Sequence, residues 1–199
     1  MRLILALGNH PPRYQNTRHN IGFICLDRWA SSHKLGFSSD DLYDYLIFKQ
    51  TVAIKPKTFM NLSGKALRAA LLRWKISESL IIHDDIELPS TQLRIRSGGG
   101  DAGHNGLKSC FEVMPPSELK RIRIGIGRSS QLPADKYVLQ DFEAEELESY
   151  AESLKLVSGF LDTYAATDFK QMLNDYSKWK KSYSGGKAAG ITSPKEEQG

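Results

Sequence analysis

Cysteine and long apolar runs are both scarce in this sequence. Its 199 residues include two cysteines, Cys25 and Cys110, which is too few for a fold held by disulfide bonds. Both lie in helical patterns, so we expect buried thiols. No apolar run reaches the about 18 residues that cross a bilayer. The apolar run from Leu3 to Leu7 is also too short for a signal peptide. We therefore expect a protein of the cytoplasm, with the mitochondrion as the alternative.

The sequence also lacks an excess of one charge and any low-complexity composition. Its net charge is +4, hydrophobic residues make up 40%, and it has 16 glycines and 8 prolines. These values exclude an intrinsically disordered or collagen-like chain and fit one globular domain. Apolar periodicity ends near residue 183. We expect one domain over residues 1–183 and a disordered tail over residues 184–199.

Apolar patterning predicts strands that alternate with helices. The strand-like stretches are Leu3 to Leu7, Leu46 to Phe48, Val52 to Ile54, Leu80 to His83, Leu93 to Arg96 and Ile122 to Ile126. Apolar residues recur at helical spacing around Ile21–Trp29, Leu67–Trp74, Leu107–Met114, Leu147–Leu161 and Phe169–Tyr176. This alternation predicts a single α/β domain, with a mixed, mostly parallel, twisted sheet and helices on both faces.

Polar residues gather where the predicted strands end, which is where ligands bind in such sheets. His19 comes just before the first helix, and Asn20 could cap that helix. A helix N-terminus favours a neutral imidazole, which can act as a general base. Asn61 could likewise cap a helix or donate its amide to a substrate carbonyl.

Two carboxylates, Asp84 and Asp85, end a buried apolar strand after His83. This placement suits a catalytic acid or a group that orients a base. Because neighbouring strand residues point to opposite faces and no helical histidine pair follows, a metal site is disfavoured.

A glycine-rich loop, residues 98–103, follows a strand in which Arg94 and Arg96 alternate with apolar residues. Two guanidinium groups on one strand face can grip a phosphate. Lys108, Arg121 and Arg123 extend this basic character. The loop is neither a Walker loop, because no Gly-Lys-Ser/Thr ends it, nor a dinucleotide-binding fingerprint.

Taken together, six ordered motifs resemble the bacterial-type peptidyl-tRNA hydrolases. They are Leu7-Gly8-Asn9, Thr17-Arg18-His19-Asn20-Ile21-Gly22, Thr58-Phe59-Met60-Asn61-Leu62-Ser63-Gly64, His83-Asp84, Gly103-His104-Asn105-Gly106-Leu107 and Arg121-Ile122-Arg123-Ile124-Gly125-Ile126-Gly127. Tyr137-Val138-Leu139 is similar to a later motif of the family. The first loop, Asn9-His10-Pro11, departs from the family's Asn-Pro-Gly and suggests a divergent, eukaryotic member.

The resemblance implies a monomeric esterase without metal or cofactor that acts on peptidyl-tRNA and does not bind membranes. It cleaves the ester between a peptide and the 3′-terminal ribose of tRNA. The implied catalytic residues are His19, Asp84 and Asn9. The implied substrate-binding residues are Tyr14, Phe59, Met60, Asn61, His104 and Asn105. The implied residues that bind tRNA phosphate are Arg94, Arg96 and Arg123. Arg94 and Arg96 match the pair that clamps the 5′-phosphate, and Arg123 matches another basic position near the RNA surface.

Two other functions stay open from the sequence. The same fold resembles a plant organelle splicing factor, so a non-catalytic RNA-binding module is the main alternative. A small-molecule esterase without an RNA partner is the other, but it leaves Arg94 and Arg96 without a role.

Overall fold

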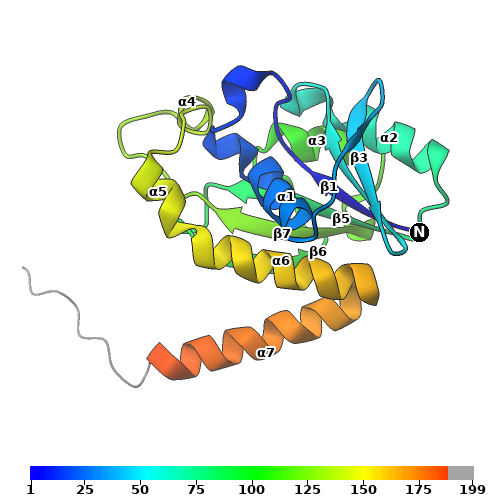
Figure 1. Cartoon of the computed structure of the whole chain (residues 1–199). Helices are drawn as coiled ribbons and strands as arrows, with labels where there is room; N and C mark the ends of the chain where they lie inside the picture. Colours follow the sequence, from blue (N-terminus) through cyan, green and yellow to red (C-terminus); the bar gives the residue numbers. More distant parts are fainter. Residues whose placement is uncertain (188–199) are drawn as a thin grey trace, which may run out of the picture.

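A computed structural model describes residues 1–187 and consists of one sheet with helices on both faces (Figure 1). The strands are β1 (Arg2–Ala6), β2 (Ser38–Ser39), β3 (Tyr43–Phe48), β4 (Thr51–Pro56), β5 (Glu78–Asp85), β6 (Leu93–Ser97) and β7 (Leu119–Gly125). The α-helices are α1 (Ile21–Ser32), α2 (Ser63–Arg73), α3 (Asn105–Phe111), α4 (Ala134–Tyr137), α5 (Ala144–Ser149), α6 (Ala151–Ala166) and α7 (Phe169–Lys187). Single 3-10 turns are η1 (Pro12–Tyr14), η2 (Arg18–Asn20), η3 (Met60–Leu62) and η4 (Pro116–Glu118).

The sheet has the strand order β2-β3-β4-β1-β5-β7-β6. β4, β1, β5 and β7 pair in parallel, while β2–β3, β3–β4 and β6–β7 pair antiparallel. Five of the seven strands therefore share one direction, and the predicted mixed, mostly parallel sheet is confirmed. The carboxyl ends of β1, β5 and β7 meet at one edge.

Two apolar cores flank the sheet because side chains alternate along each strand. Ile82 faces the core that Trp29 of α1 and Leu161 of α6 complete. Ile81 faces the core under α2 and α3, with Leu67 and Leu107. The helices therefore cover both faces, as expected. No helix within residues 1–187 is long and apolar enough to cross a membrane.

The apolar stripe from Leu147 to Leu161 forms two helices where one long helix was predicted. The break between α5 and α6 lies at Tyr150, which is fully buried and whose hydroxyl donates to the Gly125 carbonyl at 3.0 Å. This hydrogen bond holds Tyr150 at the end of β7, so the chain changes direction there.

The last described helix, α7, continues to Lys187, four residues beyond the expected end of the domain at residue 183. It packs back along α6 (Figure 1). Residues 188–199, most of the expected tail, lie outside the described residues.

Candidate active site

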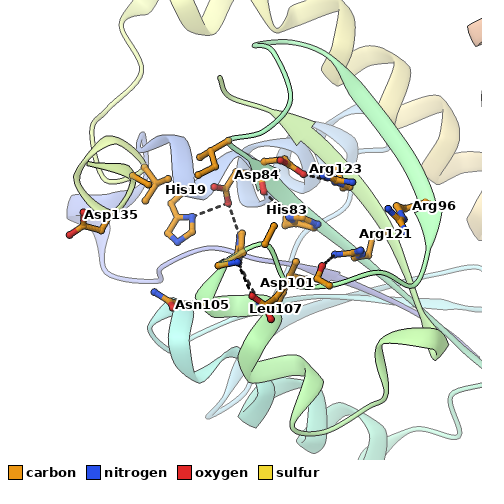
Figure 2. A pocket seen from close by; sticks show the side chains of 18 residues that line it. His19, His83, Asp84, Arg96, Asp101, Asn105, Leu107, Arg121, Arg123 and Asp135 are labelled. Carbon is orange, nitrogen blue, oxygen red and sulfur yellow. Dashed lines mark hydrogen bonds and ion pairs between the residues drawn. The ribbon is translucent and has the colours of Figure 1, made fainter. Parts of the chain in front are cut away.

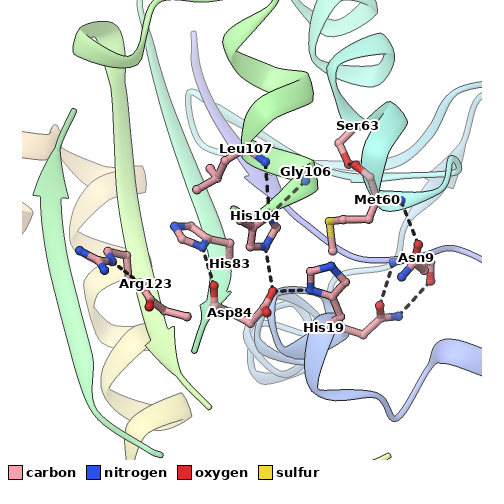
Figure 3. Close-up of polar contacts among 12 residues, drawn as sticks. Asn9, His19, Met60, Ser63, His83, Asp84, His104, Gly106, Leu107 and Arg123 are labelled. Carbon is pink, nitrogen blue, oxygen red and sulfur yellow. Dashed lines mark hydrogen bonds and ion pairs between the residues drawn. The ribbon is translucent and has the colours of Figure 1, made fainter. Parts of the chain in front are cut away.

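Asp84 lies at the carboxyl end of β5, and two histidines bind the same oxygen of its side chain. His19 Nδ1 and His104 Nε2 each lie 2.9 Å from Asp84 Oδ1, although His19 is 65 residues away in the sequence (Figure 3). All three side chains are buried or nearly so. The structure therefore brings together the predicted catalytic pair, His19 and Asp84.

A close approach between α1 and the sheet places His19 beside Asp84. A Cβ atom at Gly22 would lie 2.6 Å from the Leu7 carbonyl oxygen and 2.7 Å from that of Ile82. Only glycine allows this contact. The turn before the helix is also held by Val138, whose carbonyl accepts from the His19 backbone N–H at 2.8 Å.

The hydrogen bonds of His104 assign its tautomer. Its Nδ1 accepts from the backbone N–H groups of Gly106 and Leu107 at 3.1 and 3.3 Å, and so caps α3. Because Nδ1 accepts, Nε2 carries the proton and donates it to Asp84. Both nitrogens of His104 are thus used inside the protein, and its ring lies 4.9 Å from that of His19.

The charge of Asp84 is stabilised by these histidines. Burial by itself raises the pKa of the Asp84 carboxyl, but the electrostatic interactions with His19 and His104, together with their hydrogen bonds, outweigh burial and hold its pKa well below the usual range. Asp84 is therefore a buried carboxylate that accepts two N–H donors.

Within residues 1–187, His19, Asp84 and His104 form the group whose atoms could hold a metal ion, with potential ligand atoms all within 4.8 Å. The donor set fits poorly, because His104 Nε2 carries a proton while Nδ1 accepts two N–H groups. Ligation through Nε2 would need a second deprotonation of this ring.

Neighbouring residues of β5 point to opposite faces, as their sequence order predicts. Asp84 faces His19, whereas Asp85 forms an ion pair with Arg123 of β7. His83 donates from Nδ1 to the Asp84 carbonyl at 2.6 Å. Burial, followed by the electrostatic interaction with His104, lowers the pKa of His83. His83, Asp84 and Asp85 therefore do not form one ligand set.

Asn9 and Asn20 form a buried pair next to His19. The Asn9 N–H donates to Asn20 Oδ1 at 2.8 Å, and Asn20 Nδ2 donates to the Asn9 carbonyl at 2.9 Å. Asn9 Oδ1 accepts from the Met60 N–H at 2.9 Å. Asn20 precedes α1, yet its side chain makes no cap bond, so the expected capping role is wrong. A paired asparagine was not evident from sequence because its partner is in another loop.

One cavity of about 660 Å³ joins the histidines to the arginines (Figure 2). Six predicted site residues line it: His19, Asp84, Arg96, His104, Asn105 and Arg123. The other six, Asn9, Tyr14, Phe59, Met60, Asn61 and Arg94, are not among its lining residues.

Four of these six residues have quite different surroundings. Met60 is buried beside Gly106, and Phe59 is 48% exposed. Tyr14 lies under the Arg13 guanidinium at 4.8 Å. Asn61 lines a second groove, between α2 and α3, and its 3-10 turn makes no side-chain cap bond.

Four arginines occupy one face of the β6–β7 pair. Arg94 lies opposite Arg123 and Arg96 opposite Arg121, and residues opposite each other in an antiparallel pair share a face. Arg94 and Arg96 are exposed, whereas Arg121 is only 3% exposed. The expected basic surface is present, but Arg121 lies beneath it.

Comparison with known proteins identifies one family to which this chain is similar. The family model described as peptidyl-tRNA hydrolase matches residues 3–184. The peptidyl-tRNA hydrolase of Campylobacter curvus (strain 525.92) is 35% identical over 178 residues, covering 89% of this chain and 97% of that protein. That of Citrifermentans bemidjiense is 40% identical over 163 residues, covering 77% and 85%.

The crystal structure of peptidyl-tRNA hydrolase from Acinetobacter baumannii has the same fold. Its TM-score is 0.78 at 25% identity, and the match covers 87% of this chain and 93% of that one. Because the family model spans nearly the whole described chain and the relatives align along most of their lengths, this chain belongs to the peptidyl-tRNA hydrolase family.

Proposed function

We propose that this protein hydrolyses the ester between a peptide, or an N-blocked amino acid, and the 3′-terminal ribose of tRNA. The observation that carries the proposal is a single cavity that holds the His19–Asp84 pair on one side and Arg96 and Arg123 on the other. Such a cavity combines a general base with groups that bind phosphate. Membership of the family supports the same activity.

In the proposed mechanism, His19 is the general base. Its Nδ1–H donates to Asp84, so the lone pair of Nε2 can accept a proton from water. The water oxygen then bonds to the ester carbonyl carbon and forms a tetrahedral intermediate. On collapse, the bond to the ribose oxygen breaks, and that oxygen takes the proton from His19 Nε2. Asp84 stabilises the transient imidazolium.

Asn9 and Asn105 are the proposed donors to the water and the carbonyl oxygen. The Met60 N–H donates to the oxygen of the Asn9 side chain, so the amide nitrogen of Asn9 is the group left to donate to substrate. Asn105 lines the cavity directly. A well-placed donor of this kind contributes about 3 kcal/mol in the transition state.

The remaining substrate residues are proposed to bind the peptide and the terminal nucleotide. Tyr14 and Phe59 supply aromatic surface, and the buried Met60 holds Asn9 through its backbone N–H. Asn61 supplies an amide in the neighbouring groove. His104 is proposed to position Asp84 and not to contact substrate directly, since both of its ring nitrogens are already hydrogen-bonded within the protein.

Arg94, Arg96 and Arg123 are the proposed contacts to the 5′-phosphate. Their shared strand face allows two guanidinium groups to meet one phosphate. We further propose action without metal, as a monomer, in the cytoplasm or the mitochondrion. That the chain is a divergent eukaryotic member stays a prediction.

The test is hydrolysis of N-acetyl-aminoacyl-tRNA by the purified protein, with and without a chelator. We expect turnover in both conditions, loss of turnover in His19→Ala, and competition by deacylated tRNA. A protein that binds tRNA but never cleaves the ester would instead be the non-catalytic RNA-binding module. Turnover that deacylated tRNA does not inhibit would indicate a small-molecule esterase.

A further inference from the structure

Arg121 is a buried arginine beside the exposed Arg94 and Arg96, and the glycine loop covers it. Its Nη1 donates to the Gly100 carbonyl at 2.9 Å, and its Nη2 donates to the Gly98 carbonyl. Burial, and then the charges of Arg123 and Arg96, lower the pKa of Arg121 to about 10. The two carbonyls therefore compensate a charge that burial and repulsion disfavour.

The loop backbone touches the buried arginine and an exposed one at the same point. A Cβ atom at Gly99 would lie 2.6 Å from Arg121 Nη2 and 2.7 Å from Arg96 Nη2. The φ angle of Gly99 is +91°, a conformation that other residues rarely adopt. Gly99 thus lies between Arg96, a proposed phosphate-binding residue, and Arg121.

The same loop leads to His104 through a short hydrogen-bonded turn. The carbonyl of Asp101 accepts from the His104 N–H at 2.9 Å, and its Oδ1 accepts from the Gly103 N–H at 2.7 Å. Gly100, which Arg121 holds, directly precedes this turn. His104 then bonds to Asp84, and Asp84 to His19. Hydrogen bonds thus connect the loop that Arg121 holds to the residues that orient the base.

We propose that Arg121 is a positioning residue that couples phosphate binding at Arg96 to the His104–Asp84–His19 centre, by holding the glycine loop. An anion on Arg96 neutralises the charge that repels Arg121, which strengthens the hold of Arg121 on the two loop carbonyls. The phosphate then increases kcat as well as affinity. This inference rests on the proposed function.

The test compares Arg121→Gln and Arg121→Lys with the wild type, on N-acetyl-aminoacyl-tRNA with and without its 5′-phosphate. Lysine keeps the charge but lacks the planar fork that reaches both carbonyls. We expect both variants to lower kcat by about 10- to 100-fold with KM changed less than twofold, because small misplacements of catalytic groups cost that much. Removal of the phosphate should lower kcat of the wild type about 10-fold, but not kcat of the variants. Arg28→Gln, at an exposed position of α1, is the matched control for loss of one charge.

Three results would overturn the coupling: an unchanged kcat in both variants, a rise in KM alone, or a phosphate effect on kcat that persists in the variants. A second measurement does not depend on the variants folding. Ring ¹⁵N NMR of His104 in the wild type, with deacylated tRNA bearing a 5′-phosphate or a 5′-hydroxyl, should show a phosphate-dependent shift. Identical spectra refute the inference, whereas absence of wild-type turnover refutes the proposed function instead.

Discussion

Replacement of Asp84 by asparagine tests the proposed mechanism most directly. Asparagine has nearly the same shape, and its amide oxygen can accept from both His19 Nδ1 and His104 Nε2 in place of Oδ1. The geometry is therefore kept, while the negative charge is lost. The change isolates the electrostatic contribution of Asp84 to the imidazolium that forms on His19.

The magnitude follows from the distance. The N–O contact of 2.9 Å places the two charge centres about 4 Å apart, where the attraction is about 4 kcal/mol at an effective dielectric constant near 20. The neutral hydrogen bond of the amide retains about 1 kcal/mol. The loss of about 3 kcal/mol predicts a kcat lower by roughly 10²-fold.

Steady-state hydrolysis of N-acetyl-aminoacyl-tRNA measures this effect, with thermal unfolding to verify that the variant is folded. The KM should change little, because Asp84 does not contact phosphate in this proposal. Asp162→Asn is the matched control: His33 Nε2 lies 2.6 Å from Asp162 Oδ1 between α1 and α6, away from the cavity. A folded Asp84→Asn protein with kcat within threefold of the wild type would refute the charge-stabilisation argument.

Four further predictions follow from the same contacts. His19→Ala should lower kcat by at least about 100-fold with unchanged affinity for deacylated tRNA in a filter-binding assay, since only the base is removed; loss of both activity and binding would contradict this role. Arg94→Ala/Arg96→Ala should raise KM and reduce the slope of log Kd against log salt concentration by about 1, and an unaltered slope would count against the clamp. Trp29→Ala should cost about 3–5 kcal/mol of unfolding free energy in urea titrations, because Trp29 is fully buried between α1 and α6; a cost below about 1 kcal/mol would show that this core repacks. The lowered pKa of Asp84 stabilises the fold fully above about pH 5, and this stabilisation is lost progressively as pH falls through and below the ordinary aspartate pKa near 4. The melting temperature of the wild type should therefore fall more steeply with acid than that of Asp84→Asn. Parallel curves of melting temperature against pH would contradict the lowered pKa.

The sequence predicted the elements well because local patterning controls them. Six of the seven strands and the first three helices lie where apolar periodicity placed them. β2 (Ser38–Ser39) has no apolar residue and was not predicted. The break at Tyr150 was missed because it results from a hydrogen bond to Gly125, which the helical pattern does not contain.

The candidate site was only partly predictable. Ordered motifs pointed to His19, Asp84 and the asparagines, but not to how they pair. Asn20 looked like a helix cap and instead holds Asn9. His104 looked like a substrate ligand and is bonded at both nitrogens within the protein.

What the sequence alone determined is which residues share a face, since alternation along β5 and β6 separates Asp84 from Asp85 and aligns Arg94 with Arg96. Which side chains on a shared face are buried was decided by the tertiary structure. Arg96 and Arg121 have the same side chain and lie opposite each other, yet a loop that follows β6 covers only Arg121. Burial and pairing depend on segments that are distant in the chain. The contact between His19 and Asp84, which are 65 residues apart in the sequence, depends on the tertiary structure for the same reason.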